Sequence, residues 1–179
     1  FSEGAFSLAI TDLPACPEPQ NLNVTNVTTD SVDLNWDDVT EATVGFEWFV
    51  FLAGADPAVD APVDTNTTGV GVTTVNVTGL TPQTDYDFYV SSDCDTNGTS
   101  TLAGPESFST LALPPANDDV CDAIALTINP SSSAGDAFTN VGATAQTDEP
   151  VAGCFNNGID GSVWFTFVAP ASGSVEVTT

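Results

Sequence analysis

Carboxylates are the side chains of this sequence best placed to do chemistry, and several of them are clustered. The clusters are Asp37 with Asp38, Asp85 with Asp87, Asp93 with Asp95, and Asn117, Asp118 and Asp119 with Asp122. Calcium takes about six to eight oxygen ligands, which Asp, Asn and main-chain carbonyls can provide. The last cluster is the candidate calcium site because it lies at a predicted domain junction, where an ion would stiffen the linker. None has the EF-hand spacing, and a solvated acidic turn is the simpler interpretation of each.

The chain contains no lysine, arginine or histidine, and this absence excludes most other chemistry. Its 179 residues include 25 Asp and Glu, so the formal net charge is -25. Catalysis therefore has no imidazole base, ammonium nucleophile or guanidinium clamp. No side chain can neutralise the phosphates of a nucleic acid, and anionic membranes are disfavoured for the same reason.

Catalysis by carboxylates alone is the remaining enzymatic option. Two carboxylates can form a glycosidase pair, but their separation in space decides this, and the sequence singles out no pair. The triplets Asp64-Thr65-Asn66 and Asp95-Thr96-Asn97 lack the glycine of an aspartic-protease triplet and are interpreted as turns. We therefore expect a chain that is not an enzyme, has no catalytic residue and requires no cofactor, with calcium as the one candidate ion.

Four cysteines, Cys16, Cys94, Cys121 and Cys154, indicate structural disulfides and an oxidising compartment. Three pairings are possible in principle. The composition changes near Leu113-Pro114-Pro115 and leaves one pair on each side, which favours Cys16 with Cys94 and Cys121 with Cys154. Zinc is disfavoured, because the sequence has no Cys-x-x-Cys pair and no histidine.

The acidity also indicates an extracellular medium. Like charges repel one another, and salt screens this repulsion beyond a distance of ~8 Å at physiological ionic strength. A salty or calcium-containing exterior fits such a chain, although the acid could serve only as a solubility coat. The sequence has no apolar run long enough to span a bilayer and no signal peptide. It starts at Phe1 instead of methionine, so we expect a processed or excised piece of a longer product.

The elements that position these residues are predicted to be β-strands, with almost no helix. Short runs rich in Val and Thr alternate with Gly, Pro, Asn and Asp, which is typical of a β-sandwich. The expected strands are Ala5 to Ile10, Asn21 to Val27, Ser31 to Trp36, Gly45 to Leu52, Val72 to Val77, Asp85 to Ser91, Pro105 to Thr110, Ala123 to Ile128, Val163 to Val168 and Ser174 to Thr178. The segment from Ala53 to Gly71 is expected to be a loop.

Residues 16–110 resemble a fibronectin type III domain. The residues that carry the resemblance are Pro17 and Pro19 before the first strand, Leu34 and Trp36, and Leu80-Thr81-Pro82 leading into Tyr86, Phe88 and Val90. The last run is similar to the tyrosine-corner strand of that family, in which a buried tyrosine hydroxyl bonds back to the preceding turn. A disulfide from the first strand to the end of the Tyr86 strand is typical of bacterial secreted versions.

The resemblance also predicts a contact surface. If Phe46, Trp48 and Val50 face the core, Phe49 and Phe51 face outward, because successive side chains of a strand alternate. Tyr89 of the neighbouring strand is expected to point outward beside them. Phe49, Phe51 and Tyr89 would then form an apolar contact patch, unless the loop from Ala53 to Gly71 folds over it.

Residues 115–179 resemble the first half of a second β-sandwich, similar to the pre-peptidase C-terminal domains of secreted bacterial proteins. The motifs are Pro115-Ala116-Asn117-Asp118-Asp119 with Cys121, Gly142-Ala143-Thr144, Glu149-Pro150, Cys154, and Ser162 to Gly173. The start of the chain, Phe1 to Ile10, looks like the closing strand of such a module. We therefore expect tandem β-sandwiches, one immunoglobulin-like and one partial jelly-roll-like, divided as residues 1–15, 16–112 and 113–179.

This alternation resembles the large secreted or surface adhesins of Bacteroidota. It implies an extracellular, non-catalytic structural or adhesive segment of a repetitive stalk or filament. Its partners would be neighbouring modules, copies of itself, a glycan or a surface receptor. The alternative is an accessory carbohydrate-binding or positioning module of a secreted hydrolase. Asp30-Ser31-Val32 fits the O-glycosylation pattern of that phylum at Ser31, whereas the Asn-x-Thr triplets at Asn23, Asn26, Asn66, Asn76 and Asn97 arise readily by chance.

Overall fold

The computed structural model describes residues 16–127, 138–147, 149 and 160–176. The chain divides between Thr110 and Leu111 into two compact units. Each unit is built from strands, with two short 3-10 turns at Asp95–Asn97 and Val120–Asp122 in the described residues. The expectation of an all-β fold is therefore confirmed.

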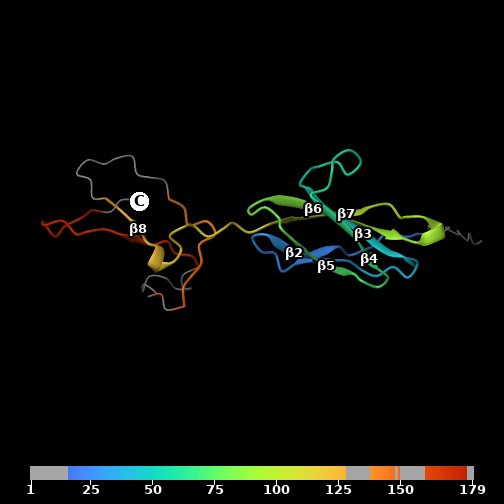
Figure 1. The fold of residues 1–179 in the computed structure, drawn as a ribbon, viewed down its shortest axis with the longest axis horizontal. Coiled ribbons are helices and arrows are strands. Elements are labelled where there is room, and N and C mark those ends of the chain that lie inside the picture. The colour runs from blue at the N-terminus through green and yellow to red at the C-terminus, as the bar shows by residue number, and fades with distance from the viewer. Residues whose placement is uncertain (1–15, 128–137, 148, 150–159, 177–179) are drawn as a thin grey trace, which may run out of the picture. The chain divides into compact units, whose positions relative to one another are not determined.

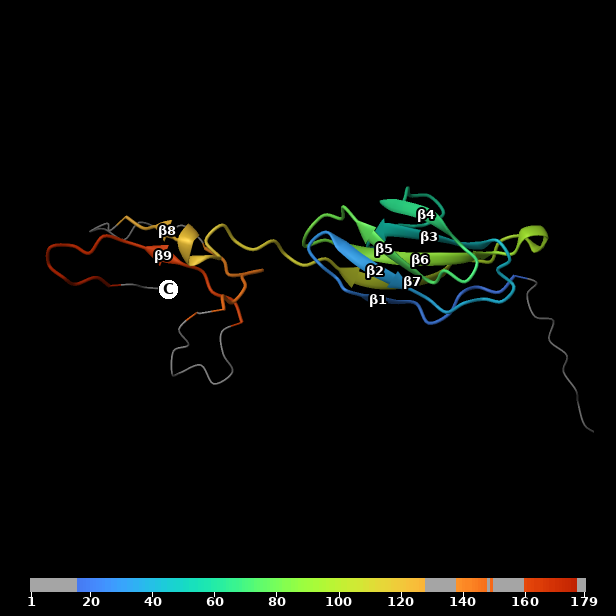
Figure 2. The same ribbon diagram turned by 60° about the horizontal axis from the view of Figure 1, so that its bottom comes forward.

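The first unit is a sandwich of two antiparallel sheets (Figures 1 and 2). The three-stranded sheet has the order β1-β2-β5, and the four-stranded sheet has the order β4-β3-β6-β7. The strands are β1 (Asn23–Thr25), β2 (Ser31–Asn35), β3 (Gly45–Leu52), β4 (Asp64–Gly69), β5 (Thr74–Thr78), β6 (Asp85–Asp93) and β7 (Ala103–Ser109). Sheets that face each other must alternate apolar residues inward and polar residues outward.

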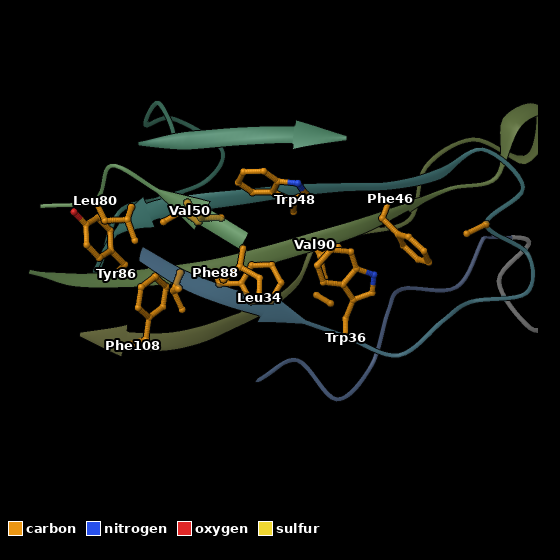
Figure 3. Close-up of a cluster of buried hydrophobic side chains, with 14 residues drawn as sticks. Leu34, Trp36, Phe46, Trp48, Val50, Leu80, Tyr86, Phe88, Val90 and Phe108 are labelled. Atoms are coloured by element: carbon orange, nitrogen blue, oxygen red, sulfur yellow. The ribbon is translucent and has the colours of Figure 1, made fainter. Parts of the chain in front are cut away.

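The core of the sandwich follows this alternation (Figure 3). In β3 the side chains of Phe46, Trp48 and Val50 are buried, and they share one face of the strand. From the opposite sheet, Leu34 of β2 packs into the same cluster. The indole of Trp36 meets the ring of Phe46 edge-on with centroids 5.6 Å apart. Trp36 thus contributes an aromatic contact between the two sides of the sandwich, next to the aliphatic side chains of β2 and β5.

The tyrosine corner is present as expected. Tyr86 is 1 % exposed, and its hydroxyl oxygen accepts a hydrogen bond of 2.9 Å from the main-chain N–H of Thr81. The Tyr86 ring stacks on Phe108 of β7, with centroids 5.5 Å apart. The turn before β6 is therefore fixed to the strand that follows it.

The predicted disulfide between Cys16 and Cys94 is also present. It joins the first described residue to the position just after β6, across a sequence separation of 78 residues. A loop of that length loses conformational entropy in the unfolded chain, which stabilises the folded state by up to about 4 kcal/mol.

The second unit is described in part. Its strands β8 (Ile124–Ala125) and β9 (Phe165–Thr166) pair in parallel. The ladder continues on both sides, with Ile124 N–H donating to the carbonyl of Trp164 at 3.1 Å and Leu126 N–H to that of Thr166 at 2.7 Å. These strands lie inside the two ranges expected from the sequence, Ala123 to Ile128 and Val163 to Val168, and are shorter.

Two expectations about strands are wrong. The segment from Ala53 to Gly71 is not all loop, because it contains β4, and Asp64-Thr65-Asn66 starts this strand instead of forming a turn. Residues 174–176 are described and are not in a strand, although Ser174 to Thr178 was expected to form one. The strand expected at Ala5 to Ile10, and with it the closing strand in residues 1–15, lies outside the described residues.

Candidate functional site

The three residues of the predicted contact patch lie together on the outer face of the four-stranded sheet. Phe49 of β3 is directly opposite Tyr89 of β6 in the strand register. The Phe51 ring stacks on Phe49 with centroids 6.3 Å apart and meets Tyr89 edge-on at 5.7 Å. Phe51 is only 2 % exposed, however, while Phe49 and Tyr89 are half-buried. The exposed part of the patch is therefore one aromatic pair.

Asp87 lies beside this pair and binds the loop that follows β3. This loop projects from the four-stranded sheet (Figure 1). The main-chain N–H of Gly54 donates to Asp87 Oδ2 at 2.9 Å, and the Ser107 hydroxyl donates to Asp87 Oδ1 at 2.6 Å. Asp87 is 7 % exposed. A buried carboxylate needs such donors, and here they come from a loop and from β7.

Burial raises the pKa of Tyr89, and the nearby carboxylates of Asp87 and Asp56 raise it further. Because Asp56 belongs to the loop after β3, this loop comes close to the tyrosine. The phenol therefore stays protonated and can donate a hydrogen bond beside an aromatic face.

The outer face of the three-stranded sheet carries a network of amide, hydroxyl and carboxylate groups. Asp33 on β2 accepts hydrogen bonds of 2.7 Å from the side-chain amides of Asn26 and Asn76. Thr74 donates to Asn35 at 3.0 Å on the same face. The hydrogen bond from Asn26, and to a smaller extent that from Asn76, lowers the pKa of Asp33. Side chains of this exposed face are thus held in place by one another.

Ser31, the predicted glycosylation site, begins β2. Its hydroxyl lies 2.7 Å from the Thr28 hydroxyl, and its side chain is half-buried. The Asn-x-Thr triplets at Asn23, Asn66 and Asn76 lie in strands.

The predicted calcium ligands take part in hydrogen bonds within the second unit. Asn117 is 3 % exposed, and its amide donates to the carbonyl of Trp164 at 2.9 Å. The Asp118 carboxylate accepts from the N–H and hydroxyl of Thr144 at 2.6 and 2.7 Å. Asp119 caps the 3-10 turn by accepting from Cys121 N–H at 2.8 Å. These groups connect the start of the unit to its later segments, whereas Asp122 is exposed.

No group of three or more His, Cys, Asp or Glu side chains suited to a metal ion occurs in the described parts of the chain. Cys121 is exposed. The carboxylate of Asp119, and to a smaller extent that of Asp122, raises the pKa of its thiol. Its expected partner, Cys154, lies outside the described residues, so the second disulfide stays a prediction. Within the same described ranges, no helix is long and apolar enough to cross a membrane.

Two facing antiparallel sheets around an apolar core, together with a tyrosine corner, define the first unit as an immunoglobulin-like β-sandwich module. More particularly, residues 17–105 match the model of the fibronectin type III domain. The resemblance expected from the sequence is confirmed for this segment.

Several solved structures are similar to the chain. A computer-based redesign of a β-sandwich protein is 22 % identical, with 53 % of this chain and 95 % of that chain covered and a TM-score of 0.45. The FN1–FN3 domains of chicken CNTN1 are 19 % identical, covering 53 % and 33 %, with a TM-score of 0.45. An FN3 domain of human collagen XX is 16 % identical, covering 57 % and 100 %, with a TM-score of 0.46. No curated protein matches the chain.

Proposed function

We propose that this chain is a non-catalytic, extracellular segment of a repetitive surface stalk or filament, with a structural or adhesive role. The Cys16–Cys94 disulfide within a fibronectin type III domain is the observation that carries this proposal. Structural disulfides persist in oxidising compartments, which supports a secreted or cell-surface location. The fibronectin type III fold is typically non-catalytic.

The charge of the chain supports a stalk. A formal net charge of -25 without any cationic residue keeps neighbouring segments apart and soluble. In this proposal, residues 113–179 belong to a module similar to the pre-peptidase C-terminal domains, and the functional analogy is with adhesins of Bacteroidota. Neighbouring modules and further copies are the partners, and calcium at Asn117 to Asp122 would stiffen the junction.

Surface labelling tests the location and role together. Antibodies against the fibronectin type III domain should label intact, non-permeabilised cells of the source organism. An in-frame deletion of the domain should reduce attachment of those cells to a surface, without changing their growth rate. Label that appears only after permeabilisation, or attachment unchanged by the deletion, would contradict the proposal.

An accessory carbohydrate-binding role is the second candidate. The half-buried Phe49 and Tyr89 next to Asp87 favour it, because sugar rings stack on aromatic faces beside hydrogen-bonding groups. The chain should then be retained by an insoluble polysaccharide in a co-sedimentation assay, and the variant Phe49→Ala should be retained less. The matched control is Val59→Ala, an exposed residue of the neighbouring loop. Absence of retention on plant, algal and microbial polysaccharides would exclude this role.

A further inference from the structure

The sandwich has sheet edges at β1, β4, β5 and β7, because each of these strands ends its sheet. An edge strand presents unpaired N–H and C=O groups, which pair with strands of other molecules unless something prevents it. Lysine is one of the usual protecting residues, and this chain has none. Each edge must therefore be protected in another way or remain open.

Strand β4 is protected by its own side chains. The main-chain N–H of Thr65 donates to Asp64 Oδ1 at 2.9 Å, and that of Thr67 donates to Asn66 Oδ1 at 2.8 Å. By the alternation of an antiparallel ladder, these two N–H groups point away from β3. Donors that an incoming strand would need are thus already used.

Strands β7 and β1 are protected by sequence and length. Pro105 lies in β7 and has no N–H, and the pairing of β7 with β6 shifts between Phe88 and Val90. Strand β1 has three residues, which is too short to hold a partner strand.

Strand β5 has no such protection. The N–H of Trp36 donates to the carbonyl of Thr73 at 3.1 Å, which sets the alternation of the β2–β5 ladder. Val75 and Val77 therefore bond to β2, and the main-chain groups of Thr74, Asn76 and Thr78 point outward. In the described part of the chain these outward groups make no hydrogen bond. The strand contains no proline, glycine or charge.

The sequence of β5 is a palindrome, Thr-Val-Asn-Val-Thr, centred on Asn76. We propose that β5 is the edge through which two copies of this chain associate, paired antiparallel about a two-fold axis at Asn76. In this register Asn76 lies opposite the partner's Asn76, and Thr74 opposite the partner's Thr78. Each outward N–H then lies opposite an outward C=O of the partner copy, which gives about six N–H···O=C hydrogen bonds across the axis.

The side chains suit the same register. Val75 would lie opposite the partner's Val77 on the inner face, where β-branched pairs pack well. On the outer face the Asn76 amide already donates to Asp33 at 2.7 Å, so it does not obstruct the edge. The two three-stranded sheets would join into one continuous sheet. Because a two-fold contact uses the same patch on both copies, assembly should stop at the dimer.

Charge and size set the conditions for this association. Two copies that each carry -25 repel one another at low ionic strength, so salt should strengthen the dimer. An edge of five residues gives a contact below ~1,000 Å², which is typical of weak association. Crowded copies on a surface would gain from many such contacts together. The inference deepens the proposed function, because it locates the surface by which copies would meet.

Sedimentation equilibrium of the purified full chain tests the inference. We expect a monomer at 20 µM in ~50 mM NaCl and a monomer–dimer equilibrium near 1 mM in ~1 M NaCl. The variant Thr78→Pro removes an outward N–H and places a ring in the path of the partner, so its dimerisation should weaken at least tenfold. The matched control is Thr67→Pro, which makes the same change on the exposed, self-protected edge of β4 and should dimerise like the wild type.

A second pair of variants covers the case in which a proline prevents folding. Asn76→Asp places two carboxylates at the axis, whereas Asn23→Asp makes the same charge change on β1, at the far side of the sheet. Only the first should weaken the dimer, with folding of each variant checked by circular dichroism.

Four outcomes would overturn the inference: a monomer under all conditions, equal dimers for Asn76→Asp and Asn23→Asp, assembly beyond the dimer, or a dimer that weakens as salt rises. The surface-labelling experiment is independent of them. A purified chain that stays monomeric rejects the β5 edge and leaves the stalk proposal standing, whereas unlabelled cells reject the stalk and leave the dimer.

Discussion

Replacing Tyr86 by Phe isolates the tyrosine corner, because it removes one hydroxyl and keeps the ring. The hydroxyl accepts a 2.9 Å hydrogen bond from Thr81 N–H at a site where Tyr86 is 1 % exposed. The Phe ring can still stack on Phe108 as the native ring does. The loss is therefore the hydrogen bond, together with the cost of a main-chain N–H without its acceptor.

The expected destabilisation is about 1 to 3 kcal/mol, the usual cost of leaving a polar group without its partner. For a domain of this size each kcal/mol lowers the Tm by roughly 4 to 8 °C. Urea unfolding followed by tryptophan fluorescence measures the change, because Trp36 and Trp48 lie in this core. Both proteins should carry Trp164→Phe, so that the second unit contributes no signal.

The matched control is Tyr89→Phe. Tyr89 lies on the same strand, is half-buried on the outer face, and its hydroxyl makes no hydrogen bond in the described residues. Its loss should cost less than about 0.5 kcal/mol, as for surface positions in general. If both variants lose the same free energy of unfolding, the hydrogen bond to Thr81 does not stabilise the fold and the reasoning fails.

Three further predictions concern the disulfide, pH and calcium. Replacing Cys16 and Cys94 together by Ser should lower the free energy of unfolding by about 2 to 4 kcal/mol, and an unchanged urea midpoint would contradict this. Hydrogen bonds from Asn26, which has the larger effect, and from Asn76 lower the pKa of Asp33. The ionised Asp33 therefore stabilises the folded domain fully above the ordinary carboxyl pKa, and this stabilisation is lost as the pH falls through the lowered pKa. Asp33→Asn should therefore show a smaller fall in Tm between about pH 4 and pH 2, and an acid limb identical to that of the wild type would count against it. Millimolar calcium added to a metal-free sample should raise the Tm more than magnesium does, whereas an equal response to the two ions would leave only charge screening.

The strands with an apolar face could be predicted from the sequence, and the strand without one could not. Gly45–Leu52 was predicted with its observed bounds, because it is a run of large apolar residues that begins at a glycine. In contrast, β4 has the sequence Asp-Thr-Asn-Thr-Thr-Gly, which contains no apolar residue. This segment is a strand because it pairs with β3 from Gly45 to Val50, and such pairing leaves no periodic signal in one sequence.

The site residues show the same limit. The alternation of side chains along a strand correctly predicted that Phe49, Phe51 and Tyr89 lie on one face of the sheet. It could not predict that Phe51 would be buried there. The clustering of Asn117 and the following aspartates suggested an ion site. Clustering along the chain does not show where each side chain points, and the amide of Asn117 reaches a carbonyl 47 residues away. Contacts over such distances depend on the fold.

The Cys16–Cys94 disulfide changes how the domain would carry tension. A force applied between Cys16 and Thr110 passes through the covalent bond to Cys94 and does not act along the chain between the two cysteines, where β1 to β6 lie. Only the segment after Cys94, with β7, is in the loaded path. Detaching this segment from the sheet would lengthen the domain by at most roughly 60 Å, at ~3.6 Å per residue. Complete unfolding of the reduced domain would lengthen it by roughly 340 Å. An oxidised domain therefore acts as a short, stiff link, and reduction would turn it into a long, extensible one.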